Sequence, residues 1–139
     1  MRHKDYSGTP LHKKLGIRDD SKLALVGAPS DFSTRVGAVP VGTRIVDPRS
    51  KGLDVIVLFS TSLADLERRF GKLTSRLAPS GGLWVGYPKR SSSIETDLNF
   101  TNVQQVGLGA GLVDNKSIAI DDDWSGVRFV FRLKDRPRV

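Results

Sequence analysis

The sequence predicts an α/β protein with a mostly parallel sheet, helices on both faces of the sheet, and a closing antiparallel hairpin. Residues 22–27 and 53–59 are near-continuous apolar runs, which are typical of strands covered on both sides. An amphipathic helical pattern follows between 62 and 77. Two alternating segments near the C-terminus predict the hairpin. Strands that alternate with helices indicate a parallel sheet with right-handed crossovers.

The first half of the chain is expected to hold two short helices and three strands. Thr9 suits the cap of a helix that begins at Pro10 and ends at Gly16. "DFSTRVG" (31–37) predicts one or two further helical turns with its apolar residues on one side. The strands are expected at 22–27, 43–47 and 53–59.

The clearest helix lies before Pro79. Its apolar side chains recur at steps of three and four, at Leu63, Leu66, Phe70, Leu73 and Leu77. Ser62 and Asp65 resemble a capping box at its start. Pro79 and the glycine pair after it are expected to end the helix, and a fourth strand follows at 82–87.

A further helix is expected over residues 102–110. Thr101 and Gln104 form a capping-box pair, and Gly111 suits the exit. The hairpin strands then cover 115–120 and 126–133. In the second of these the core-facing residues are expected to be Val127, Phe129, Phe131 and Leu133, with Arg128 and Arg132 toward water.

Two segments resemble the S-adenosylmethionine (SAM)-dependent methyltransferases. "LAPSGGLWV" (77–85) is similar to their "LkPGG" signature before an apolar strand, and "GLVDNKSIAIDDDWSGVRFVFR" (111–132) is similar to their last hairpin. The resemblance implies a Rossmann-like, degenerate methyltransferase-like three-layer sandwich. "YSGTPLHKKLGI" (6–17) and "GGLWVGYPK" (81–89) also resemble a small family of stand-alone bacterial proteins of unknown function, which implies no catalytic residues.

Composition restricts the chemistry. The 139 residues are expected to form one domain, and the lack of cysteine excludes disulfides and thiolate catalysis. The only histidines, His3 and His12, lie in the N-terminal segment, so no histidine triad or metal site is expected in the body, and no catalytic residue stands out. No secretion signal or membrane span is recognised, so we expect a cytoplasmic protein that does not bind membranes.

The net charge of +7 belongs to the two ends of the chain. Residues 1–18 and 128–139 each carry +4. The segments 1–8 and 134–139 are expected to be flexible, solvated tails. The alternative is that the basic ends bind nucleic acid.

The turn "VGAPSDF" (26–32) is the candidate cofactor site, with Gly27, Asp47 and Ser60 as its residues. A dinucleotide or SAM loop uses several glycines, whereas here Pro29 removes a backbone donor. The site is therefore predicted to be degenerate and to hold no cofactor. The alternative is that it still binds SAM or a nucleotide.

Other candidate sites lie at strand ends. Arg49, Lys89 and Arg90 are predicted to bind an anionic ligand, or else to be exposed loop residues. Trp124 and Arg128 are candidates for a protein partner or a homo-oligomer contact. The alternative is that Trp124 folds back onto Phe129 or the first helix.

These observations together favour a non-enzymatic ligand- or partner-binding protein on a methyltransferase-like fold. One alternative is a SAM- or nucleotide-binding methyltransferase-like enzyme, since methyl transfer needs little more than proximity and orientation. A second alternative is a nucleic-acid-associated protein that uses its basic ends.

Overall fold

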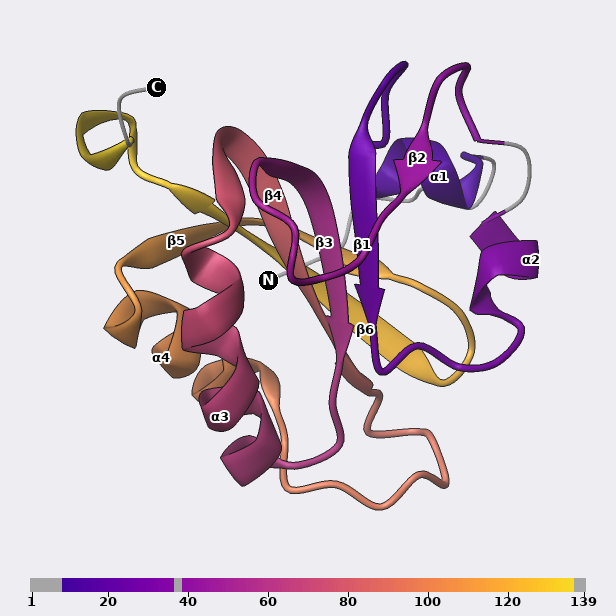
Figure 1. Cartoon of the computed structure of the whole chain (residues 1–139). Helices are drawn as coiled ribbons and strands as arrows, with labels where there is room; N and C mark the ends of the chain where they lie inside the picture. The colour runs from indigo at the N-terminus through magenta and orange to yellow at the C-terminus, as the bar shows by residue number, and fades with distance from the viewer. Residues whose placement is uncertain (1–8, 37–38, 137–139) are drawn as a thin grey trace.

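The computed structural model describes residues 9–36 and 39–136, and these form one sheet with helices on both faces (Figure 1). The elements in chain order are α1 (Leu11–Lys14), β1 (Lys22–Val26), α2 (Phe32–Val36), β2 (Arg44–Ile45), β3 (Leu53–Phe59), α3 (Leu63–Thr74), β4 (Leu77–Pro88), α4 (Phe100–Gly109), β5 (Leu112–Ala119), β6 (Trp124–Phe131) and the 3-10 turn η1 (Leu133–Asp135). The six strands lie in the order β2-β1-β3-β4-β6-β5.

The sheet is parallel from β2 to β4 and antiparallel at its other end. β4 pairs with β3 in parallel and with β6 in the antiparallel sense, and β5 closes the edge against β6. The predicted fold class, a mostly parallel sheet with a C-terminal antiparallel hairpin, is confirmed.

Strand β3 shows why both faces of the sheet are covered. Ile56 and Leu58 belong to the core under α3 and α4, while Val57 and Phe59 belong to the core under α1 and α2. All four are almost inaccessible to solvent. Figure 1 shows the two pairs of helices on opposite sides of the sheet. The continuous apolar sequence of β3 is therefore explained by burial on both sides.

Trp84 ties the first helix to the centre of the sheet. Its ring is fully buried. Its indole nitrogen donates a hydrogen bond of 2.9 Å to the Leu15 carbonyl at the end of α1. This bond satisfies the one polar group of a large buried ring.

The end of α3 differs from the prediction. The helix begins as expected, with the Ser62 hydroxyl accepting from the Asp65 amide, but it ends at Thr74. β4 then begins at Leu77, well before the predicted start at 82. The Leu53 amide donates to the Arg76 carbonyl and Leu53 pairs with Leu77, so β3 draws this segment into the sheet.

The cap of α4 also differs from the prediction. Asn99 and Asn102, not Thr101 and Gln104, form the capping box, with reciprocal bonds of 2.9 Å. Gln104 instead donates to the Asp114 carboxylate on β5. An asparagine pair serves as well as the commoner serine or threonine with glutamate, because the amide oxygen is an equally good acceptor.

The two ends of the chain lie mostly outside the described residues. The predicted flexible segment 1–8 is outside them, and of the segment 134–139 the structure describes only the η1 turn and Arg136. Within residues 9–36 and 39–136, no helix is long and apolar enough to span a bilayer.

Helix α4 offers a matched test of its packing. A Cβ at Gly107 would overlap the Phe129 ring, whereas a Cβ at Gly109, near the exposed end of the same helix, would contact nothing. Gly107→Ala should therefore lower the free energy of unfolding by about 1–3 kcal/mol through overpacking. Gly109→Ala should leave it unchanged or raise it by up to about 1 kcal/mol. Urea unfolding of both variants measures the difference, and equal effects would contradict the packing.

Candidate ligand site at the carboxyl edge of the sheet

The carboxyl ends of β1, β3 and β4 meet at one edge of the sheet. The Ser60 amide, just after β3, donates to the Gly86 carbonyl of β4. The segment 89–99 runs along this edge, below the strand ends in Figure 1. Ligands of open parallel sheets bind at such an edge.

The Gly27 turn is tightly packed at this edge. Its φ of +66° lies in the left-handed region, and a Cβ there would be 2.9 Å from the Phe59 carbonyl oxygen. A nitrogen of Arg69 would lie 3.6 Å from the same Cβ. The structure thus brings Gly27 next to the Phe59–Ser60 strand end, and glycine is required there by the close approach of β3.

A charged cluster forms around Asp65 in the first turn of α3. Its carboxylate accepts from the Ser60 hydroxyl at 3.0 Å, from Arg68 at 2.6 Å and from Arg69 at 2.9 Å. Burial acts to raise the pKa of Asp65, but the hydrogen bonds from Ser60 and Arg68 and the charge of Arg69 outweigh it and hold the pKa below its usual value. Ser60 is therefore held in place by a carboxylate that is ionised at neutral pH.

Asp47 does not join this edge. β2 pairs only with Lys22 and Leu23, at the beginning of β1. The chain then turns over residues 47–50 and approaches Arg76, which donates to the Pro48 carbonyl at the opposite end of the sheet. The cofactor role predicted for Asp47 beside Gly27 stays a prediction.

Arg49 remains with Asp47. The two side chains form an exposed ion pair at 2.9 Å, and the hydrogen bonds from Arg49 lower the pKa of Asp47 to about 2. The structure therefore separates Arg49 from Lys89 and Arg90, the other cations predicted to bind an anion.

A cavity of about 900 Å³ opens at the carboxyl end of β4, within the upper range for ligand sites. Its lining includes Tyr87, Lys89, Arg90, Ile94, Glu95, Asp97, Phe100 and Ser125. The segment 89–99 is fastened to the start of α3, because Thr96 donates to the Thr61 carbonyl and Asp97 accepts from the Leu63 amide. These bonds hold the wall of the cavity in place.

Tyr87 places a phenol at the end of β4. Its side chain is nearly buried, and this burial raises the pKa of its hydroxyl, although a hydrogen bond with Ser125 acts in the opposite direction. Ser125 lies directly across from Tyr87 on β6. The phenol is therefore neutral at physiological pH and able to donate or accept a hydrogen bond.

Several residues of this edge were missed at the sequence level. Asp65 was recognised only as a capping residue, and its cluster with Ser60 and two arginines was not predicted. Glu95 and Asp97 lie in a polar loop without a motif. Their contribution depends on where the loop returns to α3, and no local pattern encodes that return.

Trp124 and Arg128 are not side by side on a free surface. Trp124 is half-buried and packs edge-on against Phe59 at 5.0 Å, so it folds back onto the sheet, where it joins the core on the α1 and α2 side. Arg128 was expected to face water, but it is half-buried because α1 covers that face. A partner role for this pair stays a prediction.

The fold is similar to solved SAM-dependent methyltransferases. A SAM-dependent methyltransferase from Aquifex aeolicus matches with a TM-score of 0.59 and 14% identity, over 84% of this chain and 85% of that one. DhpI in complex with SAH matches with 0.58 and 10%, over 88% and 82%. Magnesium protoporphyrin IX methyltransferase from Synechocystis with bound SAM matches with 0.54 and 8%, over 88% and 74%. No family model and no curated protein sequence matches the chain.

These comparisons confirm the methyltransferase-like fold and correct the functional prediction. The favoured hypothesis of a non-enzymatic binding protein is wrong as the leading interpretation, because two of these similar structures are methyltransferases and the third is a complex with SAH. The prediction that no cofactor binds is likewise unsupported, since two of these structures contain SAM or SAH. At identities of 8–14% the likeness concerns the fold.

The Asp65 cluster predicts a pH-dependent stability. A lowered carboxyl pKa means that the unfolded chain binds the proton more readily, so the stabilisation is complete above the unfolded pKa of about 3.9 and is lost as pH falls through the folded pKa. Asp65→Asn should therefore destabilise the protein at pH 7, and the difference from wild type should shrink toward pH 3.

Urea unfolding at pH 7, 5 and 3 tests this expectation. Glu67→Gln removes an exposed carboxylate from the same helix and serves as the control. A destabilisation by Asp65→Asn that is independent of pH would show that the cluster does not act through its charge.

Proposed function

We propose that the protein is a SAM-dependent methyltransferase that binds SAM in the cavity at the carboxyl end of β4. One observation carries the proposal: a fold like that of SAM-dependent methyltransferases has a 900 Å³ cavity at the edge where open parallel sheets bind ligands. Both the proposed activity and the proposed cofactor rest on this combination of fold and cavity.

The groups that line the cavity suit SAM chemically. SAM carries a carboxylate, an ammonium, two ribose hydroxyls and a flat adenine. Lys89 and Arg90 offer cations for the carboxylate, and Glu95 and Asp97 offer acceptors for the ammonium and the hydroxyls. Phe100 adds an apolar ring against which adenine can pack.

The Gly27 turn supports the site indirectly in this proposal. Phe32, five residues later, is fully buried and packs edge-on against Phe59 at 4.9 Å, which fills the space on the α2 side. Arg69 covers the other side of the turn. The open volume lies instead toward β4, so SAM is placed in the cavity that residues 89–99 help to line.

Methyl transfer needs few acidic or basic groups from the protein. SAM supplies the electrophilic methyl group when it is bound, and transfer requires an acceptor held in line at short range. Tyr87 and Ser60 are hydroxyls at adjacent strand ends, and each is fixed by a hydrogen bond to Ser125 or Asp65. Of the two, Tyr87 lines the cavity and can orient an acceptor, whereas Ser60 is buried behind it. The lack of a histidine triad carries no weight against this reaction.

Thermal unfolding with S-adenosylhomocysteine tests the cofactor site. At about 100 times its dissociation constant the ligand should add about 2.7 kcal/mol, a rise of several degrees in Tm. The double variant Lys89→Gln/Arg90→Gln should lose most of this rise, because it removes the cations offered to the carboxylate. Arg132→Gln, an exposed arginine outside the cavity, is the control.

Methyl transfer is then tested with SAM carrying a labelled methyl group and mixed acceptor extracts. Labelled product that requires the intact protein and falls in the double variant supports the proposal. A Tm that does not change at millimolar S-adenosylhomocysteine, or a shift that the double variant retains in full, would refute this site.

A further inference from the structure

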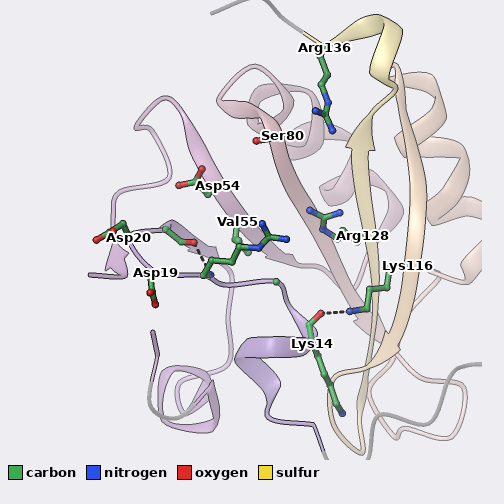
Figure 2. Close-up of a pocket in the computed structure, with 12 residues that line it drawn as sticks. Lys14, Asp19, Asp20, Asp54, Val55, Ser80, Lys116, Arg128 and Arg136 are labelled. Carbon is green, nitrogen blue, oxygen red and sulfur yellow. Dashed lines mark hydrogen bonds between the residues drawn. The ribbon is translucent and has the colours of Figure 1, made fainter. Parts of the chain in front are cut away.

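A second cavity, of about 670 Å³, lies at the opposite edge of the sheet (Figure 2). Ser21, Asp54 and Ser80 line it from the amino ends of β1, β3 and β4. The other wall comes from β5, β6 and the segment after α1. This cavity shares no lining residue with the proposed SAM site.

Cationic side chains gather on one side of this cavity. Arg128 on β6 pairs in register with Lys116 on β5, and both line the cavity together with Arg18 and Arg136. Figure 2 shows Arg128, Arg136 and Lys116 on one side and the carboxylates of the lining on the other. These carboxylates belong to Asp19, Asp20 and Asp54.

Burying the Arg128 guanidinium is costly unless an anion faces it. Like charges directly across an antiparallel pair repel one another. Burial lowers the pKa of Arg128, and the nearby charge of Arg18 lowers it further. Within the described part of the chain, Arg128 has no carboxylate partner at ion-pair distance.

The neighbouring backbone holds the cations in position. Gly82 on β4 lies against the Arg128 guanidinium, and a Cβ there would overlap it. Lys116 donates from its ammonium to the Lys14 carbonyl at 3.0 Å, while Figure 2 shows the Lys14 ammonium pointing away from the cavity. Two cations from adjacent strands are thus presented to the same space.

We propose that this cavity binds a phosphorylated small molecule of the nucleotide or sugar-phosphate type. One guanidinium group can donate to two phosphate oxygens at once. Arg128 and Arg18, together with Lys116, would therefore hold the phosphate. Hydroxyl or amino groups at the other end of the ligand would donate to Asp20 and Asp54. A concave site with an acidic side suits such a ligand better than a nucleic-acid strand, which needs an extended basic groove.

The site is independent of the proposed methyltransferase function. SAM and S-adenosylhomocysteine carry no phosphate, and the two cavities lie at opposite ends of the parallel strands. Each site is therefore tested with its own ligand and its own variants: S-adenosylhomocysteine for one, and ATP or pyrophosphate for the other. A failure to bind at one site does not affect the test of the other.

Calorimetric titration with inorganic pyrophosphate, ATP and a 12-nucleotide single-stranded RNA tests the proposal. Arg128→Gln and Lys116→Gln should each weaken ATP and pyrophosphate binding at least tenfold. Arg132→Gln, which removes an equal charge from an exposed position just after β6, should leave it unchanged. Lys116→Gln keeps the test valid should the half-buried Arg128 be needed for folding, and thermal unfolding of each variant reports that directly.

Three outcomes would overturn the proposal. The first is no binding of ATP or pyrophosphate at millimolar concentration, and the second is equal weakening by Arg132→Gln, which would indicate a diffuse basic surface. The third is that the protein binds the RNA more tightly than ATP and that Arg128→Gln abolishes this RNA binding, which would assign the cavity to nucleic acid. The S-adenosylhomocysteine shift in Lys116→Gln separates this result from the fate of the cofactor site.

Discussion

The structure depends on the two-sided pairing of β4, which is parallel to β3 and antiparallel to β6. The strand is long enough to reach both edges of the sheet, so that Ser80 lines one cavity and Tyr87 lines the other. Its glycines make this possible, since a Cβ at Gly86 would approach the Phe59 ring to 2.9 Å. The reversal at β6 then brings side chains from the end of the chain to both cavities.

Burial on both faces of the sheet determines which polar groups can act. On a face covered by helices, a charged side chain either finds a partner or lines a cavity that water and ligands can enter. Asp65 finds partners, namely Ser60 and two arginines. Arg128 instead lines a cavity. For this reason the strand alternation that sends Val127 inward does not send Arg128 into open water.

Much of the fold was predictable from local pattern, and much of the site was not. The apolar run of β3 and the helical face of α3 each encode an element by themselves, and the predicted bounds of β3 are confirmed. The early start of β4 depends on the Leu53–Arg76 hydrogen bond, and the position of Asp47 depends on how short β2 is. Lys89 and Arg90 were identified as cavity residues by their place after a strand, whereas Asp97 required knowledge of the loop's return to α3.

The closed glycine turn and the open β4 edge have different physical causes. At the turn, Phe32 in the first position of α2 packs directly onto Phe59, and the Gly27 backbone lies against the end of β3. The loop after β4 is long, and its two bonds to the start of α3 keep it away from Tyr87. The ligand-binding volume at this edge is therefore set by loop length on the β4 side, while the β1 side contributes rigidity.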